Sequence, residues 1–194
     1  AAGHALHKGS LKKKLKNESR ALMTDRGAST QLLVLDLDGI TFPGAKDKYN
    51  TYDIQNIAEA FVQYLPKEFH NVSYVAQASA SLGLKANKIS LHLFFLLGHT
   101  VQPKILKEWF RTLNYETDFL ADQLKLSANG QSISYPLDVS LADNSKLIYI
   151  APPKFSGVQD PVAGDRFVRI DRSSPILDIS SLIKDVNPEK VHSL

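Results

Sequence analysis

The sequence predicts an α+β domain with a mixed, mainly antiparallel sheet flanked by helices. Two apolar runs typical of strands, residues 71–81 and 89–97, are separated by a short small-residue turn, which predicts a hairpin. A third apolar run, residues 32–37, is expected beside that hairpin. Amphipathic helical patterns at 54–65 and 105–113 fall between the strands. Because hairpins and helices are interleaved without regular strand–helix alternation, the pattern favours an α+β sheet over a regular parallel one.

Composition limits the functions that this chain can have. The 194 residues are 43% hydrophobic and 22% charged, which is typical of one globular domain with a sizeable core. No run approaches the ~18 unbroken apolar residues that a membrane helix needs, so no membrane partner is expected. The absence of cysteine excludes disulfides and thiolate metal sites and fits a cytoplasmic protein. The formal charge of +3 permits a nucleic-acid partner without requiring one.

Two parts are expected along the chain. Residues 1–30 form a basic N-terminal segment that packs on the core or leads into it, and residues 31–194 form the folded domain. The chain does not begin with methionine, which suggests a domain excised from a longer protein. The N-terminal segment predicts a short helix over 10–23 that is either simply solvated or a basic arm that contacts nucleic-acid phosphates. Its candidate phosphate contacts are Lys12, Lys13, Lys14 and Lys16.

The first strand ends on two carboxylates. Asp36 and Asp38 follow the apolar run, and strand alternation points both side chains to the same face while Leu35 and Leu37 pack on the other. Their α-carbons are then about 6.5 to 7 Å apart. Carboxylates held this close repel each other unless a cation such as Mg²⁺ neutralises them, so a divalent-metal site is predicted. Gly39 is expected to turn the chain sharply off the strand.

Helices follow from apolar periodicity and from the residues at their ends. Residues 54–65 place their apolar side chains on one helical face, and Pro66 ends the pattern. Residues 105–113 form a second amphipathic helix, with Pro103 in its first turn. A further helix or extended turn is expected at 117–126.

The last third of the chain adds shorter elements. The Asn129-Gly130 pair is a strong turn signal, and residues 131–135 after it are a candidate short strand. Residues 146–151 are predicted as a buried strand, and the alternating residues 166–171 as an edge strand. Residues 176–186 are weakly helical.

A second polar group lies on the strand over 89–97. Lys88, Ser90 and His92 share one face of that strand, and a cation, a hydroxyl and an imidazole together are suited to bind an anion. Taken alone, His92 is equally well explained as a hydrogen-bonded core histidine. Asp138, between a turn and a strand, is by itself a surface turn or cap residue.

Three motifs occur in an order that resembles the archaeo-eukaryotic primase superfamily, and particularly the primase-polymerases of phages and plasmids. These motifs are Val34-Leu35-Asp36-Leu37-Asp38-Gly39, then Ile89-Ser90-Leu91-His92-Leu93, then Leu137-Asp138 ahead of residues 146–153. The resemblance covers about residues 3 to 155. It implies a primase-polymerase catalytic domain over 31–194, with the RRM-like element of that family.

The resemblance also implies roles for these residues. Asp36, Asp38 and Asp138 would bind two divalent cations, Mg²⁺ or Mn²⁺, and His92, helped by Ser90, would contact the triphosphate of the incoming nucleotide. The implied reaction is template-directed nucleotidyl transfer, as in a DNA primase or DNA polymerase, on single-stranded DNA with nucleoside triphosphates.

Lysines are the further phosphate contacts that the resemblance suggests. Lys85 and Lys88 lie near the second motif, whereas Lys146 stands where related sequences often have arginine and lacks the bidentate fork of that side chain. The chain carries no Gly-x-x-x-x-Gly-Lys-Ser/Thr motif, so a helicase partner would be another chain or a further domain.

Two alternatives remain open from the sequence. The run from Asp36 to Ile40 also resembles the first motif of haloacid-dehalogenase-like phosphohydrolases, in which Asp36 would be the nucleophile and Asp38 the general acid/base. Those enzymes need a later lysine and further acids on a parallel sheet, for which Lys85 or Lys88 and Gly164-Asp165 are the available residues. A non-catalytic nucleic-acid-binding module is the other alternative, but it leaves the three aspartates unexplained.

Overall fold

The computed structural model describes residue 25 and residues 27–41, 53–85, 87–162 and 164–186. Its main sheet has four strands in the order β1-β3-β2-β6, and every neighbouring pair is antiparallel. Their bounds are β1 Thr30–Thr41, β2 Tyr74–Ala78, β3 Lys88–Val101 and β6 Phe167–Ile170. The predicted α+β class, the hairpin of β2 and β3, and the edge position of β6 are confirmed.

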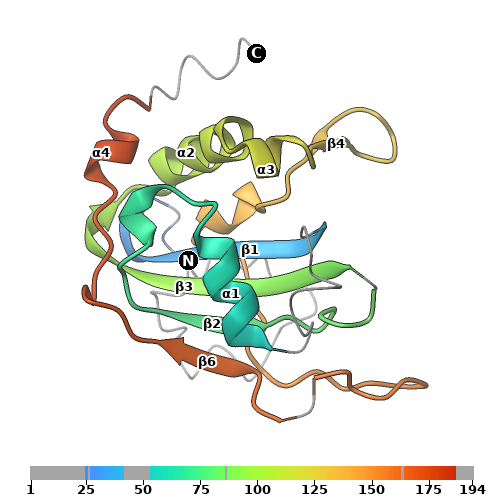
Figure 1. Cartoon of the computed structure of the whole chain (residues 1–194). Coiled ribbons are helices and arrows are strands. Elements are labelled where there is room, and N and C mark those ends of the chain that lie inside the picture. The colour runs from blue at the N-terminus through green and yellow to red at the C-terminus, as the bar shows by residue number, and fades with distance from the viewer. Residues whose placement is uncertain (1–24, 26, 42–52, 86, 163, 187–194) are drawn as a thin grey trace.

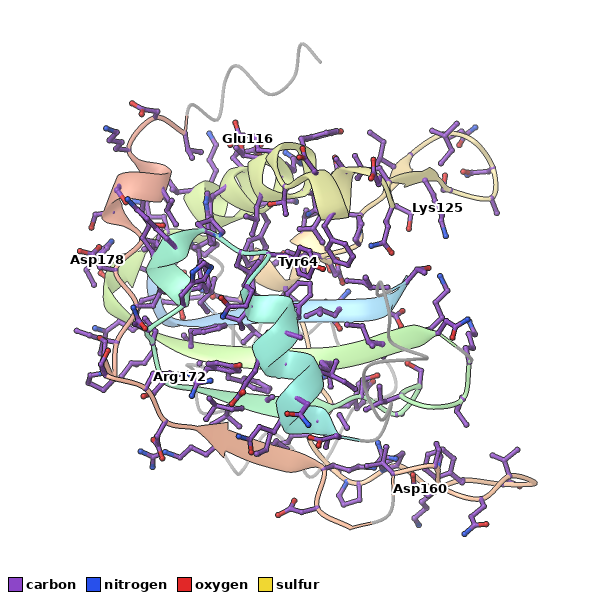
Figure 2. The ribbon with its side chains drawn as sticks, viewed as in Figure 1. Tyr64, Glu116, Lys125, Asp160, Arg172 and Asp178 are labelled. Atoms are coloured by element: carbon purple, nitrogen blue, oxygen red, sulfur yellow. The ribbon has the colours of Figure 1, made fainter. Side chains whose placement is uncertain are left out.

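Helices cover one face of this sheet, with α1 crossing in front of the strands and α2 lying beyond β1 (Figure 1). A small hairpin that contains Lys125 projects at the side of the molecule (Figure 2). The remaining elements are α1 Ile54–Val62, η2 Lys67–Phe69, α2 Pro103–Glu116, α3 Asp118–Ala121, β4 Lys125–Leu126, β5 Ile133–Ser134, η3 Val139–Ala142 and α4 Ser180–Ile183. No helix within the described ranges has the length and apolar composition to span a bilayer.

The core lies between α1, α2 and the sheet. Alternation directs Leu35 and Leu37 of β1 into it, and both are at most 1% exposed. Phe95 of β3 meets Phe69 edge to face, with ring centroids 5.1 Å apart. Phe69 also stacks on Trp109 of α2. Burial of these side chains supplies most of the driving force for folding and leaves the opposite face of β1, β3 and β2 for polar residues.

Two glycines lie inside strands: Gly39, which was expected to turn the chain off the first strand, and Gly98, which directly follows the predicted strand over 89–97. Gly39 has a φ of +65° and forms a bulge within β1, which continues to Thr41. Gly98 stays in β3, which runs on to Val101, because its N–H bonds to the Leu177 carbonyl at 2.9 Å. Continued backbone pairing therefore overrides the glycine signal at both positions.

The predicted buried strand over 146–151 is wrong. No strand is assigned there, and Tyr149 and Ile150 are 78% and 60% exposed. The outer edge of β2 is already taken by β6, and the Tyr149 carbonyl accepts a hydrogen bond from the Gln77 side chain. The segment is therefore held by a side chain of the sheet and not by strand pairing.

Smaller differences concern element length. Helix α2 is longer than the predicted 105–113 because Pro103 is its first residue and its pattern continues to Glu116. The expected helix or turn at 117–126 is only the single turn of α3 before β4, and the strand over 131–135 is reduced to β5. The predicted helix over 10–23 lies outside the described residues.

Candidate functional site

A row of polar side chains crosses three strands on the sheet face opposite the helices. Asp36 of β1 pairs directly with His92 of β3, and His92 pairs directly with Gln77 of β2. Side chains that are directly opposite in antiparallel strands lie on the same face and in contact range. Accordingly, His92 Nε2 is 3.3 Å from Asp36 Oδ1, and His92 Nδ1 is 3.1 Å from Gln77 Oε1.

This row borders a cavity of about 590 Å³. Asp36, Asp38, Gln77 and His92 form one side of it. The remaining lining comes from the last residue of β2, from the turn after it and from the segment that follows η3, namely Ala78, then Ser79, Ala80 and Ser81, then Tyr149, Ala151, Pro152 and Pro153. The cavity has the size of a site for a small organic ligand, and its ionisable side chains are two carboxylates and an imidazole.

The bulge in β1 determines how Asp38 is presented. Leu37 pairs with Leu91 and Ile40 with Ile89, so Asp38 and Gly39 together stand opposite Ser90 alone. The Gly39 N–H donates to the Ser90 hydroxyl at 3.0 Å. Asp38 is exposed beside the cavity, whereas Ser90 is only 2% exposed and is not one of the lining residues. Ser90 thus supports the bulge.

Asp138 is attached to the same end of β1 through its backbone. Its N–H donates to the Asp36 carbonyl at 3.2 Å, and Leu37 forms an isolated antiparallel bridge with Leu137. The fully buried side chain of Asn114 on α2 holds Leu137 from the other side. Asn114 accepts from the Leu137 N–H at 3.0 Å and donates to the Leu137 carbonyl at 3.1 Å. The backbone of the third predicted aspartate therefore lies beside the backbone of the first.

The carboxylate of Asp138 is stabilised as an anion. Burial raises the pKa of Asp138, but hydrogen bonds from the Ser140 hydroxyl and Ser140 N–H, together with the positive charge of Lys146, outweigh burial and lower this pKa below its usual value. Both Ser140 contacts are 2.8 Å long, and Lys146 Nζ is 3.3 Å from Asp138 Oδ2. Asp138 also caps η3, as expected for an aspartate before a helical turn.

The other predicted phosphate contacts within the described residues are not among those that line the cavity. Lys88 donates to the Thr41 hydroxyl at the end of the β1–β3 pair, and Lys85 is exposed in the turn before β3. Lys146 pairs with Asp138. Among Lys88, Ser90 and His92, which share a strand face as predicted, only His92 lines the cavity. The four lysines of the basic arm, Lys12, Lys13, Lys14 and Lys16, lie outside the described residues.

Two residues that support the site were missed in the sequence. Gln77 is the only strongly polar residue in the run Tyr74 to Ala78, and a lone glutamine inside an apolar strand is a signal that could have been used. Asn114 gave no such signal, because its partner is the backbone of a residue 23 positions later. Both side chains are buried, and in each the amide oxygen and the amide nitrogen are hydrogen-bonded.

The carboxylates suit a hard divalent cation. Mg²⁺ is commonly bound by one or two protein carboxylates together with substrate phosphates and water, which matches Asp36 and Asp38 at the cavity. Within the described ranges, no group of three or more His, Asp or Glu side chains converges closely enough to hold a metal without further ligands. Asp138 in this arrangement directs its oxygens at Ser140 and Lys146.

Comparison with known proteins adds no relative: no family model, curated protein or solved structure matches the chain.

Proposed function

We propose that this domain catalyses template-directed nucleotidyl transfer, as a primase-polymerase does. The observation that carries the proposal is the direct pairing of Asp36 with His92 across β1 and β3, beside Asp38 and at the edge of the cavity. The first two of the three motifs that the resemblance singles out thereby face each other. The tether of Asp138 to the Asp36 carbonyl supports the same proposal.

In the proposed reaction, the 3′-hydroxyl oxygen of the primer attacks the α-phosphorus of a nucleoside triphosphate. The bond from that phosphorus to the β,γ-diphosphate oxygen breaks, pyrophosphate leaves, and the hydroxyl proton passes to solvent. Asp36, Asp38 and Asp138 would hold two divalent cations, which supply charge neutralisation on the α-phosphate and the leaving group. His92 Nε2 would contact the triphosphate, and the flanking Asp36 would orient the ring.

The antiparallel sheet weakens the phosphohydrolase alternative. That reading needs its lysine and additional acids on a parallel sheet, whereas β1, β3, β2 and β6 are antiparallel throughout. Asp165, one of the acids that the alternative required, borders a separate cavity of about 150 Å³ near β6. The run from Asp36 to Ile40 is compatible with both chemistries. The antiparallel sheet supports nucleotidyl transfer over phosphate hydrolysis.

The decisive experiment is an incubation with labelled nucleotides, single-stranded DNA template, a primer and Mn²⁺ or Mg²⁺. We expect polymer from the natural sequence and none from the double variant Asp36→Asn with Asp38→Asn, since both metal-binding carboxylates are removed. Asp122→Asn is the matched control, because Asp122 is an exposed aspartate at the end of α3. Undiminished synthesis by the double variant would refute the assignment.

The two alternative functions predict different assay results. A phosphohydrolase would release phosphate from a small phosphomonoester and form a trappable acyl-phosphate on Asp36. A non-catalytic binding module would associate with single strands in a salt-dependent way and turn over no substrate.

The template is proposed to be single-stranded DNA, contacted in part by the basic arm. Neutralising Lys12, Lys13 and Lys14 should weaken template binding and reduce the salt slope by about 2, since each phosphate contact to a single strand adds roughly 0.7. Salt titration of binding measures this slope, and an unchanged slope would assign these lysines to a solvated surface. A replicative helicase is the proposed protein partner.

A further inference from the structure

Gln77 is a buried polar residue whose amide is engaged at both ends. It is the next-to-last residue of β2, between Ala76 and Ala78, and is 3% exposed. Its Nε2 is 3.0 Å from the Tyr149 carbonyl oxygen, and its Oε1 is 3.1 Å from His92 Nδ1. A buried amide is costly unless it is hydrogen-bonded, so this residue needs both partners.

The two partners fix the direction of the amide and the protonation of one ring nitrogen. The Tyr149 carbonyl can only accept, so the Gln77 atom facing it must be the donating NH₂. The Gln77 oxygen is then the atom that faces His92, and an oxygen of this kind can only accept. His92 Nδ1 must therefore carry a hydrogen and donate it to Gln77.

The other ring nitrogen is thereby assigned to the cavity. With Nδ1 bonded to Gln77, His92 Nε2 is the nitrogen that faces Asp36 Oδ1 at 3.3 Å. Ionised carboxylate and phosphate oxygens can only accept, so Nε2 donates to Asp36 or to a phosphate when the ring carries a second hydrogen on this nitrogen. We propose that Gln77 is a positioning residue that keeps the hydrogen on His92 Nδ1, holds the ring by this bond and directs Nε2 toward Asp36 and the cavity. A ring nitrogen held in this way by an outer partner is a common means of orienting a histidine that binds a ligand.

The same amide connects the histidine to the opposite wall of the cavity. Tyr149 belongs to the irregular segment after η3, and its carbonyl bond to Gln77 ties that segment to the sheet. Replacing Gln77 is therefore expected to release both the imidazole and this wall. The expected effect on nucleotide binding rests on the proposed function, because that effect requires His92 to contact the triphosphate. The assignment of the hydrogen to Nδ1 does not depend on the proposed function.

Nitrogen NMR of the histidine rings tests the hydrogen-bond assignment directly. Long-range ¹H–¹⁵N spectra of uniformly labelled protein report which ring nitrogen carries the hydrogen. They are recorded at a pH about two units above the usual histidine pKa near 6.5. The His92 signals are identified by their loss in His92→Gln. His70 serves as an internal reference, because its Nε2 is 2.9 Å from the Leu65 carbonyl and must donate. We expect hydrogen on Nδ1 of His92 and on Nε2 of His70.

Two variants separate the hydrogen-bond role from general packing. Gln77→Leu removes the acceptor and should shift His92 toward the form with hydrogen on Nε2, whereas His70 should not change. Gln77→Glu keeps an oxygen facing Nδ1 and should retain the wild-type His92 pattern. Gln55→Leu is the matched control, since Gln55 is exposed on α1 and its side chain donates to Glu59. A wild-type His92 with hydrogen on Nε2 alone, or identical His92 spectra in wild type and Gln77→Leu, would overturn the assignment.

Steady-state kinetics then test the consequence for function. Gln77→Leu should raise KM for the nucleoside triphosphate by about tenfold, the size typical of losing an outer partner of a site residue, with a smaller change in kcat. If the natural sequence makes no polymer, the proposed function fails while the spectra still decide the role of Gln77. If it does make polymer and Gln77→Leu changes the spectra without changing KM, the positioning role in catalysis is overturned.

Discussion

The two halves of the candidate site are held in different ways. Asp36, His92 and Gln77 are fixed by the continuous hydrogen-bond ladders of β1, β3 and β2. Asp138 lies in irregular chain and is fixed by a few contacts, chiefly the Asn114 clamp on Leu137 and its own N–H bond to the Asp36 carbonyl. A strand-held side chain has many redundant supports, whereas the loop-held carboxylate depends on single side chains. A substitution outside the cavity should therefore displace Asp138 more easily than it displaces Asp36, His92 or Gln77.

The largest effect is expected from Asp138→Asn. This nearly isosteric change keeps the backbone tether but removes the charge, so nucleotide incorporation should fall by more than about a hundredfold, since outer partners of a metal site alone cost about 10- to 100-fold. Incorporation assays on primed template measure the loss. Full activity of the variant with a normal melting temperature would leave Asp138 as a helix cap and confine the site to the strand-held half.

Asn114→Ala tests whether α2 positions the loop-held half. The change removes three hydrogen bonds, one to the Phe110 carbonyl and two to the Leu137 backbone, in a fully buried place. We expect a loss of about 3 kcal/mol in unfolding free energy, since each buried bond contributes about 1 kcal/mol. Urea denaturation measures it.

Asn56→Ala provides the control for that experiment. Asn56 is an exposed asparagine of α1 whose side chain donates to the N-cap residue Asp53 at 2.6 Å, and because this bond is solvent-exposed its loss should cost about 1 kcal/mol or less. Incorporation by folded Asn114→Ala protein should also fall, while the spectrum of His92 on the strand-held half should stay unchanged. A shift of the His92 signals would show that the two halves are not independent.

His92→Ala addresses the strand-held half alone. Loss of a hydrogen bond to a charged phosphate should weaken nucleotide binding by about tenfold and leave divalent-cation binding unchanged. Titration calorimetry with the nucleotide and with Mn²⁺ separates the two. His99→Ala is the matched control on the same strand, where the side chain is 40% exposed. Unchanged nucleotide affinity would return His92 to a structural role.

The smallest effect is expected from Ser140→Ala, and it should depend on pH. The Ser140 hydroxyl is one of the groups that lower the pKa of Asp138 in the folded protein. A carboxyl whose folded pKa lies below its unfolded value near 3.9 stabilises the fold above that value, and the gain is lost as pH falls through the folded pKa. The difference in unfolding free energy between wild type and Ser140→Ala should be full above about pH 5 and shrink in more acidic buffer. Urea denaturation across this range tests it, and a difference independent of pH would contradict it.

Alternation was enough to predict which polar side chains of β1 and of β3 share a face in the strand-held half. The shared face of Asp36 and Asp38 and the shared face of Ser90 and His92 follow from the period of a strand, and the structure has both. The register that brings Asp36 opposite His92 was not predictable, because it depends on how β1 and β3 align. Gln77 could have been suspected as a lone polar residue in an apolar strand.

The loop-held half was much less predictable. An apolar, β-branched run such as 146–151 reads as a buried strand whether or not an edge is available for it, and here β6 occupies the edge of β2. The position of Asp138 depends on Asn114, which acts through backbone contacts that leave no pattern in the sequence. Glycine was ambiguous for a related reason, since Gly39 and Gly98 serve equally well inside a paired strand and at its end.

The bulge at Gly39 also changes what an insertion or deletion would do to this protein. Asp38 and Ile40 are two positions apart, yet Asp38 lines the cavity while Ile40 is 2% exposed and paired with the core residue Ile89. Removing Gly39 would bring Ile40 into regular alternation behind Leu37, so its place in the core would survive the loss of one residue. The deletion would remove the bulge that presents Asp38 at the cavity and the hydrogen bond from the Gly39 N–H to Ser90. The core packing of β1 thus does not need Gly39, whereas the position of Asp38 at the cavity does.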